Sequence, residues 1–345
     1  MKSLNCLDLA VIAACLVPAA AEAQSVPTNL PGVRAYLNAP ADFNPVTAAP
    51  EALDVYGFPP RPNATSAPED YADWVRTVTT PARAILPILK ETNIYHGPAR
   101  NLRGAGAGTV GNVTDVTSSN WSGYIISSST KPFKVEEVKA NFMVPVAQQA
   151  FGICSESAVY GSSWVGIDGD GSDDVLQDGI SFSASCDDSV TTPSYAAWYE
   201  WYPYSETVIT NFPVSPGDDI TVEVWNTSAT AAKAYLINYT ANTKVTISFS
   251  APSGTTLTGN CVEWIVERPE VGDGLTNLTN YIATAFFNSM AWNYTASTPT
   301  YNEPGKAPSG TVYASTMLDN SSNPISYPVV GGTVDIWFFD EGSAR

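Results

Sequence analysis

The chain from Ser118 onward consists of short runs of β-branched and aromatic residues that alternate with clusters of Gly, Pro, Asn, Asp and Ser. Regular turn signals with almost no helical periodicity are typical of an antiparallel β-sandwich. The expected strands are 121–126, 134–144, 163–167, 175–182, 195–202, 219–225, 234–238, 244–250, 262–267, 283–290 and 333–339. The sequence therefore predicts one all-β domain, and a domain of this length can bury a large core.

Residues 24–111 have a different pattern, which is rich in Pro and Ala. One amphipathic helix is predicted over 69–77. Its apolar face would consist of Tyr71, Trp74, Val75 and Val78. A glycine-rich stretch at 101–112 predicts a flexible joint. We interpret 24–111 as a propeptide and 112–345 as the β-sandwich domain, with a disordered spacer as the alternative for the first part.

The first 23 residues have the features of a secretory signal peptide. Lys2 precedes an apolar stretch over 9–17, and the small-residue sequence Ala21-Glu22-Ala23 provides a cleavage site. The apolar stretch is too short to span a bilayer, which makes a permanent anchor the weaker interpretation. We therefore expect a secreted, extracellular protein.

Charge divides the chain at the same place as the hydrophobic pattern. Residues 24–111 hold seven Lys and Arg against seven Asp and Glu, whereas residues 112–345 hold eight against 25. A strongly acidic surface repels nucleic acid and anionic membranes, so neither partner is expected. It suits low pH, because protonation of the carboxylates relieves their mutual repulsion. Acidity that serves only solubility is the alternative on charge alone.

The chain contains one histidine, His96, and it lies in the predicted propeptide. The β-sandwich domain alone therefore cannot form a Ser–His–Asp triad, a Cys–His dyad or a histidine zinc site. The acidic run at 168–174 lacks the spaced glutamate of an EF-hand loop, so no metal or other cofactor is expected.

Three cysteines follow the predicted signal, namely Cys154, Cys186 and Cys261. In an oxidising compartment we expect one disulfide and one free thiol. Three pairings are possible, and we favour Cys154 with Cys186.

Hydrolysis without histidine requires carboxylates as the general acid and general base. Three segments combine carboxylates with aromatic residues, namely 162–182, 195–204 and 261–271. Because side chains on a strand alternate between faces, Trp198, Glu200 and Tyr202 share one face. Glu263 and Glu267 likewise share a face. The sequence thus predicts a groove lined by glutamates and aromatic rings.

These segments resemble the glutamic peptidases, or eqolisins, a family of pepstatin-insensitive acid endopeptidases. The family's motifs occur in order as SNWSGY (119–124), FMVP (142–145), SWVGIDGDG (163–171), VLQDG (175–179), AWYEWYP (197–203) and VEWIVE (262–267). The similarity covers essentially residues 116–345, and a signal plus propeptide matches the family's layout. We expect the sandwich to be a concanavalin-like or lectin-like jelly roll.

The resemblance implies that Gln177 and Glu267 are the catalytic pair. Glu267 would take a proton from water and later deliver it to the leaving nitrogen, while the Gln177 amide would stabilise the oxyanion. A base near its reference pKa of about 4.3 predicts activity in acid. The resemblance assigns substrate-binding or cleft-supporting roles to Trp121, Trp164, Asp168, Trp198, Glu200 and Tyr202. Ser181 and Ala196 depart from it, because the family pattern has aspartate at both positions.

The expected partners are protein or peptide substrates and the chain's own propeptide as an inhibitor, and we expect a monomer. The propeptide's cations would face the acidic domain. These cations are Arg76, Arg83, Lys90, Arg100 and Arg103.

Two other functions fit parts of the pattern. A glycoside hydrolase on a lectin-like sandwich could use Glu200 with Glu263 or Glu267, although it gives Gln177 no role. A carbohydrate-binding protein could use the aromatic residues as platforms without any catalysis.

Overall fold

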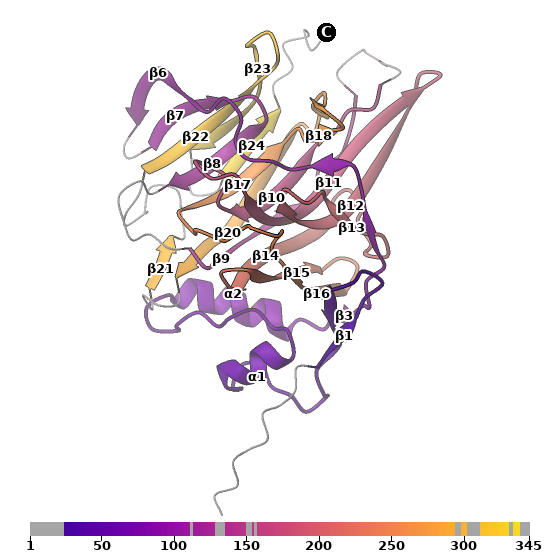
Figure 1. The fold of residues 1–345 in the computed structure, drawn as a ribbon, viewed down its shortest axis with the longest axis vertical. Coiled ribbons are helices and arrows are strands. Elements are labelled where there is room, and N and C mark those ends of the chain that lie inside the picture. The colour runs from indigo at the N-terminus through magenta and orange to yellow at the C-terminus, as the bar shows by residue number, and fades with distance from the viewer. Residues whose placement is uncertain are drawn as a thin grey trace, which may run out of the picture.

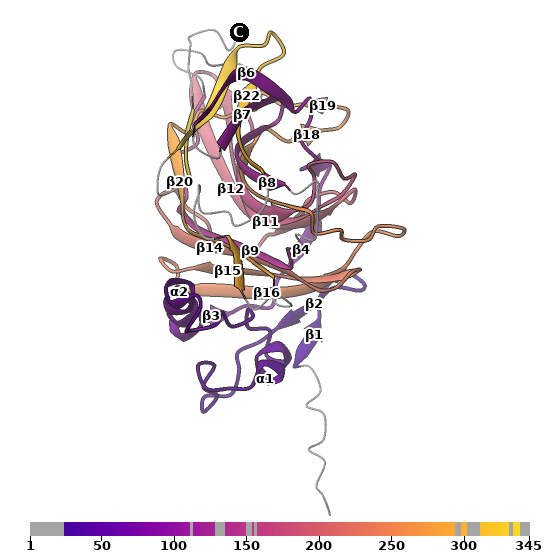
Figure 2. The ribbon, with the colours of Figure 1, turned by 90° about the vertical axis from the view of Figure 1, so that its left-hand side faces the viewer.

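Two β-sheets packed face to face form most of the protein (Figures 1 and 2). The computed structural model describes residues 24–110, 113–127, 135–149, 154, 157–293, 298–301, 311–330 and 334–338. The predicted signal peptide, residues 1–23, lies outside the described residues. We name the two sheets upper and lower from their positions in Figure 2.

The upper sheet follows the order β6 (Arg103–Val110), β7 (Val113–Ser118), β22 (Thr311–Leu318), β8 (Trp121–Ser127), β17 (Cys261–Glu267), β10 (Ser162–Ile167), β11 (Val175–Asp187), β12 (Val190–Tyr202), β13 (Thr207–Ile209) and β4 (Leu89–Glu91). The lower sheet follows the order β1 (Ser25–Pro27), β2 (Arg34–Tyr36), β16 (Thr243–Ser250), β15 (Ala231–Asn238), β14 (Asp219–Ser228), β9 (Glu137–Met143), β20 (Ala283–Asn293) and β21 (Thr298–Tyr301).

Strand β20 belongs to both layers. Its first half pairs with β24 (Val334–Phe338), which continues through β23 (Pro324–Val330) to β22 of the upper sheet. Its second half pairs with β9 of the lower sheet, after an irregularity between Phe287 and Met290. Asn288, with φ of 49°, lies in this bend. One long strand thus joins the two layers at one side of the sandwich.

The prediction of an all-β domain is confirmed, and each of the eleven expected strands has a counterpart. Most pairs are antiparallel, but β22 with β7 and β16 with β3 (Arg83–Ala84) are parallel. The prediction missed β22, whose sequence TVYASTML mixes small and polar residues. It also missed β23, which contains two prolines.

The central strands of the upper sheet, β8, β17 and β10, are buried on both faces. Side chains such as Val165, Ile180 and Trp264 point into the core between the two sheets. Because side chains alternate along each strand, the opposite face carries a second apolar cluster. This cluster consists of Trp121, Ile125, Trp164, Val175, Trp198 and Ile265. Ala99 and Leu102, from the predicted propeptide, pack against it.

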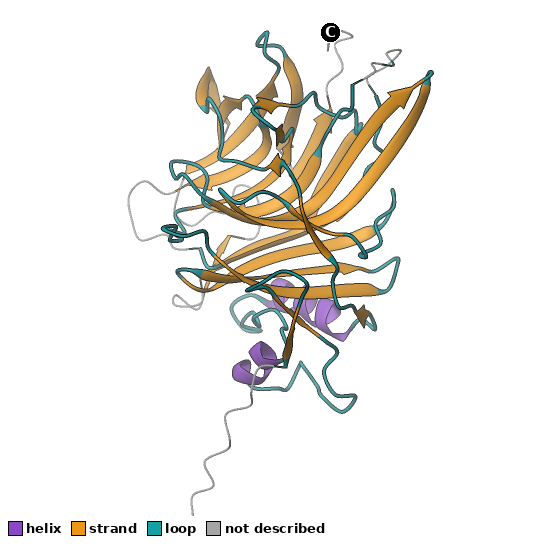
Figure 3. Ribbon diagram, turned by 45° about the vertical axis from the view of Figure 1, so that its right-hand side comes forward, coloured by secondary structure: helices purple, strands orange, loops and turns teal. Residues whose placement is uncertain are grey.

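Residues 24–110 are integrated into both sheets. Strands β2 and β3 extend the β16 edge of the lower sheet, and β4 extends the β13 edge of the upper sheet. Helices α1 (Pro50–Val55) and α2 (Pro68–Thr79) lie beneath the lower sheet (Figure 3). The predicted helix is therefore present as α2, with Trp74 and Val78 buried. The glycine-rich stretch, where we expected a flexible joint, forms β6 as far as Val110.

The face of the lower sheet under α2 carries a buried cluster of charged side chains. Lys139 of β9 forms an ion pair with Asp73 of α2, and the buried carboxyls of Glu137 and Glu223 lie beside it. Lys233 Nζ lies 2.6 Å from Asp54 Oδ1 of α1. The same face also carries buried apolar side chains, since Met290 and Trp292 pack on Ala67 of the N-terminal segment. The segment therefore covers both polar and apolar surface of the lower sheet.

The expected cationic contacts of the predicted propeptide are present only in part. Arg100 forms an ion pair with Glu270, but Arg76 pairs with Asp73 of its own helix and packs over the Tyr239 ring. Across the lower sheet the charges run the other way, since lysines of the β-sandwich meet aspartates of the N-terminal segment.

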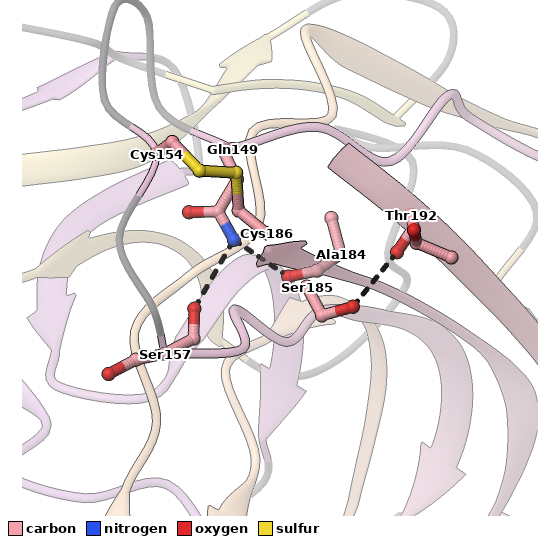
Figure 4. The surroundings of a disulfide bond; sticks show 7 residues. All are labelled: Gln149, Cys154, Ser157, Ala184, Ser185, Cys186 and Thr192. Atoms are coloured by element: carbon pink, nitrogen blue, oxygen red, sulfur yellow. Dashed lines mark hydrogen bonds between the residues drawn. A yellow bond between two sulfur atoms is a disulfide. The ribbon is translucent and has the colours of Figure 1, made fainter. Parts of the chain in front are cut away.

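The disulfide prediction is confirmed, because Cys154 is bonded to Cys186 with their Cα atoms 5.5 Å apart. It fastens the loop before β10 to the outer part of β11 (Figure 4). Beside it, Gln149 Nε2 donates to the carbonyls of Ala184 at 2.9 Å and Ser157 at 3.3 Å. Cys261 is free and buried. Within the described residues, no helix has the length and apolar character needed to cross a membrane.

Candidate active site

Four neighbouring strands, β17, β10, β11 and β12, bring the predicted site residues onto one face of the upper sheet. Their register aligns Glu267 with Ser162 and then Ser181, and it aligns Gly166 with Gln177 and then Glu200. The row between them holds Ile265, Trp164, Gly179 and Trp198. Gly179 leaves room for the neighbouring tryptophan, since an added Cβ would lie 2.5 Å from Trp164 Cβ.

The Glu267 carboxylate is buried and has three side-chain partners. Its Oε2 lies 2.9 Å from His96 Nδ1 and accepts from Trp164 Nε1 at 3.0 Å, and its Oε1 accepts from Asn120 Nδ2 at 3.1 Å. Burial raises the pKa of Glu267, while the hydrogen bonds from His96, Asn120 and Trp164 oppose that shift. The carboxylate is therefore held in a fixed orientation within a water-poor site.

The Gln177 side chain contacts the same residue as Glu267 does. Its amide nitrogen Nε2 donates to the main-chain carbonyl of His96, while its Oε1 is buried and has no hydrogen-bond partner among the residues that the structure describes. One residue thus receives a hydrogen bond from Gln177 at its carbonyl and contacts Glu267 through its ring. The two predicted catalytic side chains therefore both contact His96, at different groups.

His96 is enclosed on every side. Its ring stacks on Trp198 at 3.9 Å, and its Nε2 lies 3.0 Å from Glu206 Oε2. Its main-chain N–H donates to both carboxylate oxygens of Glu200, at 3.1 and 3.2 Å. Burial alone would lower the pKa of His96, but the hydrogen bonds to Glu206 and Glu267 and the negative charges of Glu267 and Glu200 raise it to about 10. The imidazole is therefore a cation among carboxylates.

The residues after His96 continue across the face through main-chain hydrogen bonds. The Gly97 carbonyl accepts from Trp121 Nε1 at 3.1 Å, and the Ala99 N–H donates to the Gly169 carbonyl at 3.1 Å. The N–H of Arg100 donates to a side-chain oxygen of the SNWSGY segment, Asn120 Oδ1, at 2.8 Å. Recognition through main-chain groups is how a cleft binds an extended peptide. This cleft is thus filled by a segment of its own chain.

The remaining predicted site residues lie farther from the His96 contacts. The Tyr202 ring packs against Gly97, where an added Cβ would be 3.2 Å from it. Asp168 is fully buried, and its carboxylate accepts from the main-chain N–H groups of residues 258–260, which fixes the turn before β17. Glu263 accepts from the Cys261 thiol at 3.2 Å rather than reaching His96.

Two groups at this site were missed by sequence reasoning. Asn120 lies in the SNWSGY segment, where only Trp121 was assigned a role. Glu206 follows the AWYEWYP segment in a stretch without a motif. The place of His96 in the cleft was also missed, because the sequence assigned it to the predicted propeptide. Its contacts with Glu267 and Glu206 are separated by 171 and 110 residues in sequence, so no local pattern could reveal them.

Residues 119–327 match the family model described as the Peptidase A4 family. The chain belongs to this family. It is 33% identical over 196 residues to aspergillopepsin-2 of Aspergillus niger, a match that covers 52% of this chain and 67% of that protein. It is 35% identical over 150 residues to scytalidopepsin B of Scytalidium lignicola, which covers 43% of this chain and only about half, 51%, of that protein.

Solved structures agree with this assignment. A crystal structure of scytalido-glutamic peptidase with a transition state analog inhibitor superposes with a TM-score of 0.51 at 26% identity, covering 64% of this chain and 98% of that chain. A second structure of this peptidase, with a peptide-based transition state analog, also gives 0.51, at 27% identity. The predicted membership among the glutamic peptidases is confirmed, and the chain is a glutamic endopeptidase. The family match begins at Ser119, after the N-terminal segment that fills the cleft.

Proposed function

We propose that this Peptidase A4 protein is a secreted acid endopeptidase, made as a proenzyme, in which Glu267 and Gln177 hydrolyse peptide bonds. One observation carries the proposal: a peptide carbonyl of the chain itself, that of His96, accepts a hydrogen bond from Gln177 while the same residue covers Glu267. This contact supports the proposal, because Gln177 would donate in the same way to the carbonyl of a substrate peptide.

The chemistry follows from the two side chains. Once His96 has left, the Glu267 carboxylate binds a water molecule and takes its proton as the oxygen attacks the scissile carbonyl carbon. The carbonyl becomes a tetrahedral oxyanion, which accepts a hydrogen bond from Gln177 Nε2. Protonated Glu267 then delivers the proton to the leaving nitrogen, the C–N bond breaks, and the carboxylate is restored. Because an amide does not titrate, the Gln177 donor is retained at any acidity.

Asn120 and Trp164 are positioning residues in this scheme. They donate to Oε1 and Oε2 of Glu267 respectively, so the carboxylate keeps its orientation when His96 is absent. Donors to a carboxylate stabilise its charged form, which keeps a buried glutamate available as a base in acid.

The segment over 94–100 acts as the internal inhibitor in this proposal. The His96 ring occupies the place beside Glu267 that a water molecule needs, so a bound carbonyl cannot be attacked. Removal of residues 24–111 frees the cleft. Secretion is supported by the predicted signal peptide and by the Cys154–Cys186 disulfide, since disulfides persist in oxidising compartments.

The variant Gln177→Ala tests the proposal. After incubation of the full chain at about pH 4, near the carboxylate reference pKa, we expect the wild type to degrade casein and haemoglobin. Loss of an oxyanion donor lowers the rate by about 10²–10³-fold. The variant Gln148→Ala, at a half-buried glutamine before the disulfide loop, should keep full proteolysis. Unchanged proteolysis in Gln177→Ala, or cleavage of a polysaccharide by the wild type, would contradict the proposal.

A further inference from the structure

One buried carboxylate of the cleft has no part in the proposed reaction. Glu206 lies between β12 and β13 and is 1% exposed. Its Oε2 accepts from the Ser181 hydroxyl at 3.0 Å and lies 3.0 Å from His96 Nε2. Ser181 is one of the two positions where we expected aspartate. Its hydroxyl instead holds a carboxylate that comes from a different part of the chain.

The slot around the His96 ring matches an imidazole at each of its polar atoms. Glu206 faces Nε2, Glu267 faces Nδ1, and the Ser162 hydroxyl lies 3.3 Å from Nδ1. The flat face of the ring lies on Trp198 with an interplanar angle of 5°. A protonated imidazole has two N–H donors and a planar ring, which is the complement of two carboxylates beside an indole.

Other side chains fit this slot less well. An aliphatic residue would leave Glu206 and Glu267 buried without a cation, which is costly in a water-poor site. Glutamine is uncharged, and a lysine ammonium lacks the planar ring that stacks on Trp198.

We propose that Glu206 makes this slot a subsite for histidine, and that a peptide presenting histidine there binds as an inhibitor rather than as a good substrate. The proposal rests on the proposed function of Glu267 and Gln177. The inhibitory binding follows from the geometry. An imidazole whose one nitrogen contacts Glu206 contacts Glu267 through its other nitrogen. The ring then keeps the attacking water away from the base, so tight binding and rapid turnover oppose each other.

Two peptides test the proposal on acid-incubated full-length protein. The first is the blocked hexapeptide with the sequence of residues 94–99, and the second has glutamine in place of its histidine. Inhibition of casein cleavage is measured at about pH 5, which lies below the reference pKa of imidazole and above that of a free glutamate. We expect the histidine peptide to inhibit about tenfold more strongly or better, and to be cut slowly itself.

The role of Glu206 is tested by the ratio of the two inhibition constants within each enzyme. In Glu206→Gln this ratio should fall to within about threefold of one, because the charged partner of the imidazole is lost. The control variant Asp187→Asn removes a carboxylate at the exposed turn of the β11–β12 hairpin and should keep the wild-type ratio. If Glu206→Gln does not fold, full-length His96→Gln provides a second test, and it should become active at least about tenfold faster at the same pH.

The outcomes separate the two proposals. Proteolysis by the wild type with equal inhibition by both peptides, a ratio that survives in Glu206→Gln, or wild-type activation kinetics in His96→Gln would overturn the histidine subsite alone. Absence of any acid proteolysis in the wild type would overturn the proposed function together with it.

Discussion

At the scale of single residues, His96 and Glu267 form a pair in which each changes what the other can do. The ring of His96 is 2.9 Å from Glu267 Oε2 and 3.0 Å from Glu206 Oε2, and these carboxylates raise the pKa of His96 to about 10 against the lowering effect of burial. A carboxylate paired with an imidazolium is a weak base, and this one has no room for water. For both reasons we expect the closed cleft to be inactive.

The sign of the His96 shift gives a prediction for stability against pH. The pKa of His96 is raised in the folded chain. The stabilisation that its protonated ring gives the fold is therefore fully present below the unfolded pKa of about 6.5 and is lost as the pH rises toward 10. We expect the thermal stability of the full chain to fall between pH 6.5 and 10. In His96→Gln most of this fall should be absent, which thermal unfolding at pH 6, 8 and 10 would reveal. Parallel curves for the two proteins would rule out the assigned role of the imidazole.

The residues that sequence reasoning placed correctly on the cleft face share one property. Gln177, Glu200 and Glu267 lie in regular strands, where alternation alone decides which side chains point the same way. Asn120 and Glu206 escaped because each lies just outside a strand and gains its role from contacts with His96 or Glu267. That the chain's one histidine would fill the cleft was equally hidden, since the sequence assigned it to a segment expected to be removed.

At the scale of elements, the hairpin of β11 and β12 is the longest feature of the upper sheet, and thirteen paired positions join its strands. It carries Gln177 and Glu200 near one end and Cys186 near the other. The disulfide closes a loop with a sequence separation of 32. Through β10 and β11 the same region positions Trp164 beside Glu267.

Removing the disulfide should lower stability without removing the site. For a loop of this length, the chain-entropy model gives a loss of about 3–4 kcal/mol for Cys154→Ser with Cys186→Ser. Denaturant unfolding of the double variant and of the wild type measures this loss. The control Cys261→Ser leaves the disulfide intact. A double variant as stable as the wild type would show that the bond does not stabilise the fold.

The contact between α2 and the lower sheet has a pH dependence of its own. Burial raises the pKa of Glu137 well above its usual range, and the neighbouring Glu223 raises it further. Because the pKa of Glu137 is raised in the folded chain, the contact is most stable below about pH 4.5, where Glu137 is protonated in both states. This stability is lost as the pH rises through the pKa of Glu137 in the folded chain. Acid therefore favours this contact.

The variant Glu137→Gln should remove the penalty of the buried charge. At pH 7.5 we expect the full chain to gain about 1–3 kcal/mol, and at pH 4 we expect little change. Its half-buried neighbour gives the control Glu136→Gln. Unfolding free energies at the two pH values provide the measurement. An equal effect at both pH values would contradict a raised pKa of Glu137 in the folded chain.

Sequence reasoning placed most elements but not their partners. The helix over 69–77 was predicted from its apolar face, yet nothing in that periodicity indicates a docking surface that includes Lys139 and Glu223. Strands β2, β3 and β4 were missed because each has only two or three residues and forms by adding to an existing sheet edge. Short edge strands of this kind depend on the sheet rather than on their own propensity.

At the scale of the whole molecule, the N-terminal segment contacts the β-sandwich over several surfaces. It extends edges of both sheets, covers the outer face of the lower sheet with α2, and inserts residues 96–100 into the cleft. The covered surfaces include polar and main-chain groups together with buried apolar side chains. Met290 and Trp292 pack on Ala67, and the tryptophan cluster of the cleft packs on Ala99 and Leu102. Departure of the segment would therefore expose apolar surface, which is typical of a binding site.

The composition of the chain distinguishes its two parts. Residues 24–111 have balanced charge beside a strongly acidic domain, which led us to expect a removable segment, and the absence of a second histidine restricts the chemistry expected of that domain to carboxylates and amides. It did not indicate how the parts meet, because lysines of the β-sandwich pair with aspartates of the segment as well as the reverse.

The activity of Glu267→Gln is the sharpest test of the proposed general base. After incubation of the full chain at about pH 4, hydrolysis of a quenched fluorescent peptide gives kcat/KM for the variant and the wild type. We expect a fall of about 10²–10⁴-fold, because the variant cannot accept the proton of water. The control Glu263→Gln lies on the same face of β17, and burial raises the pKa of Glu263 well above its usual range, so glutamine resembles its neutral form. A Glu267→Gln enzyme within about threefold of the wild type would contradict the assignment of the general base.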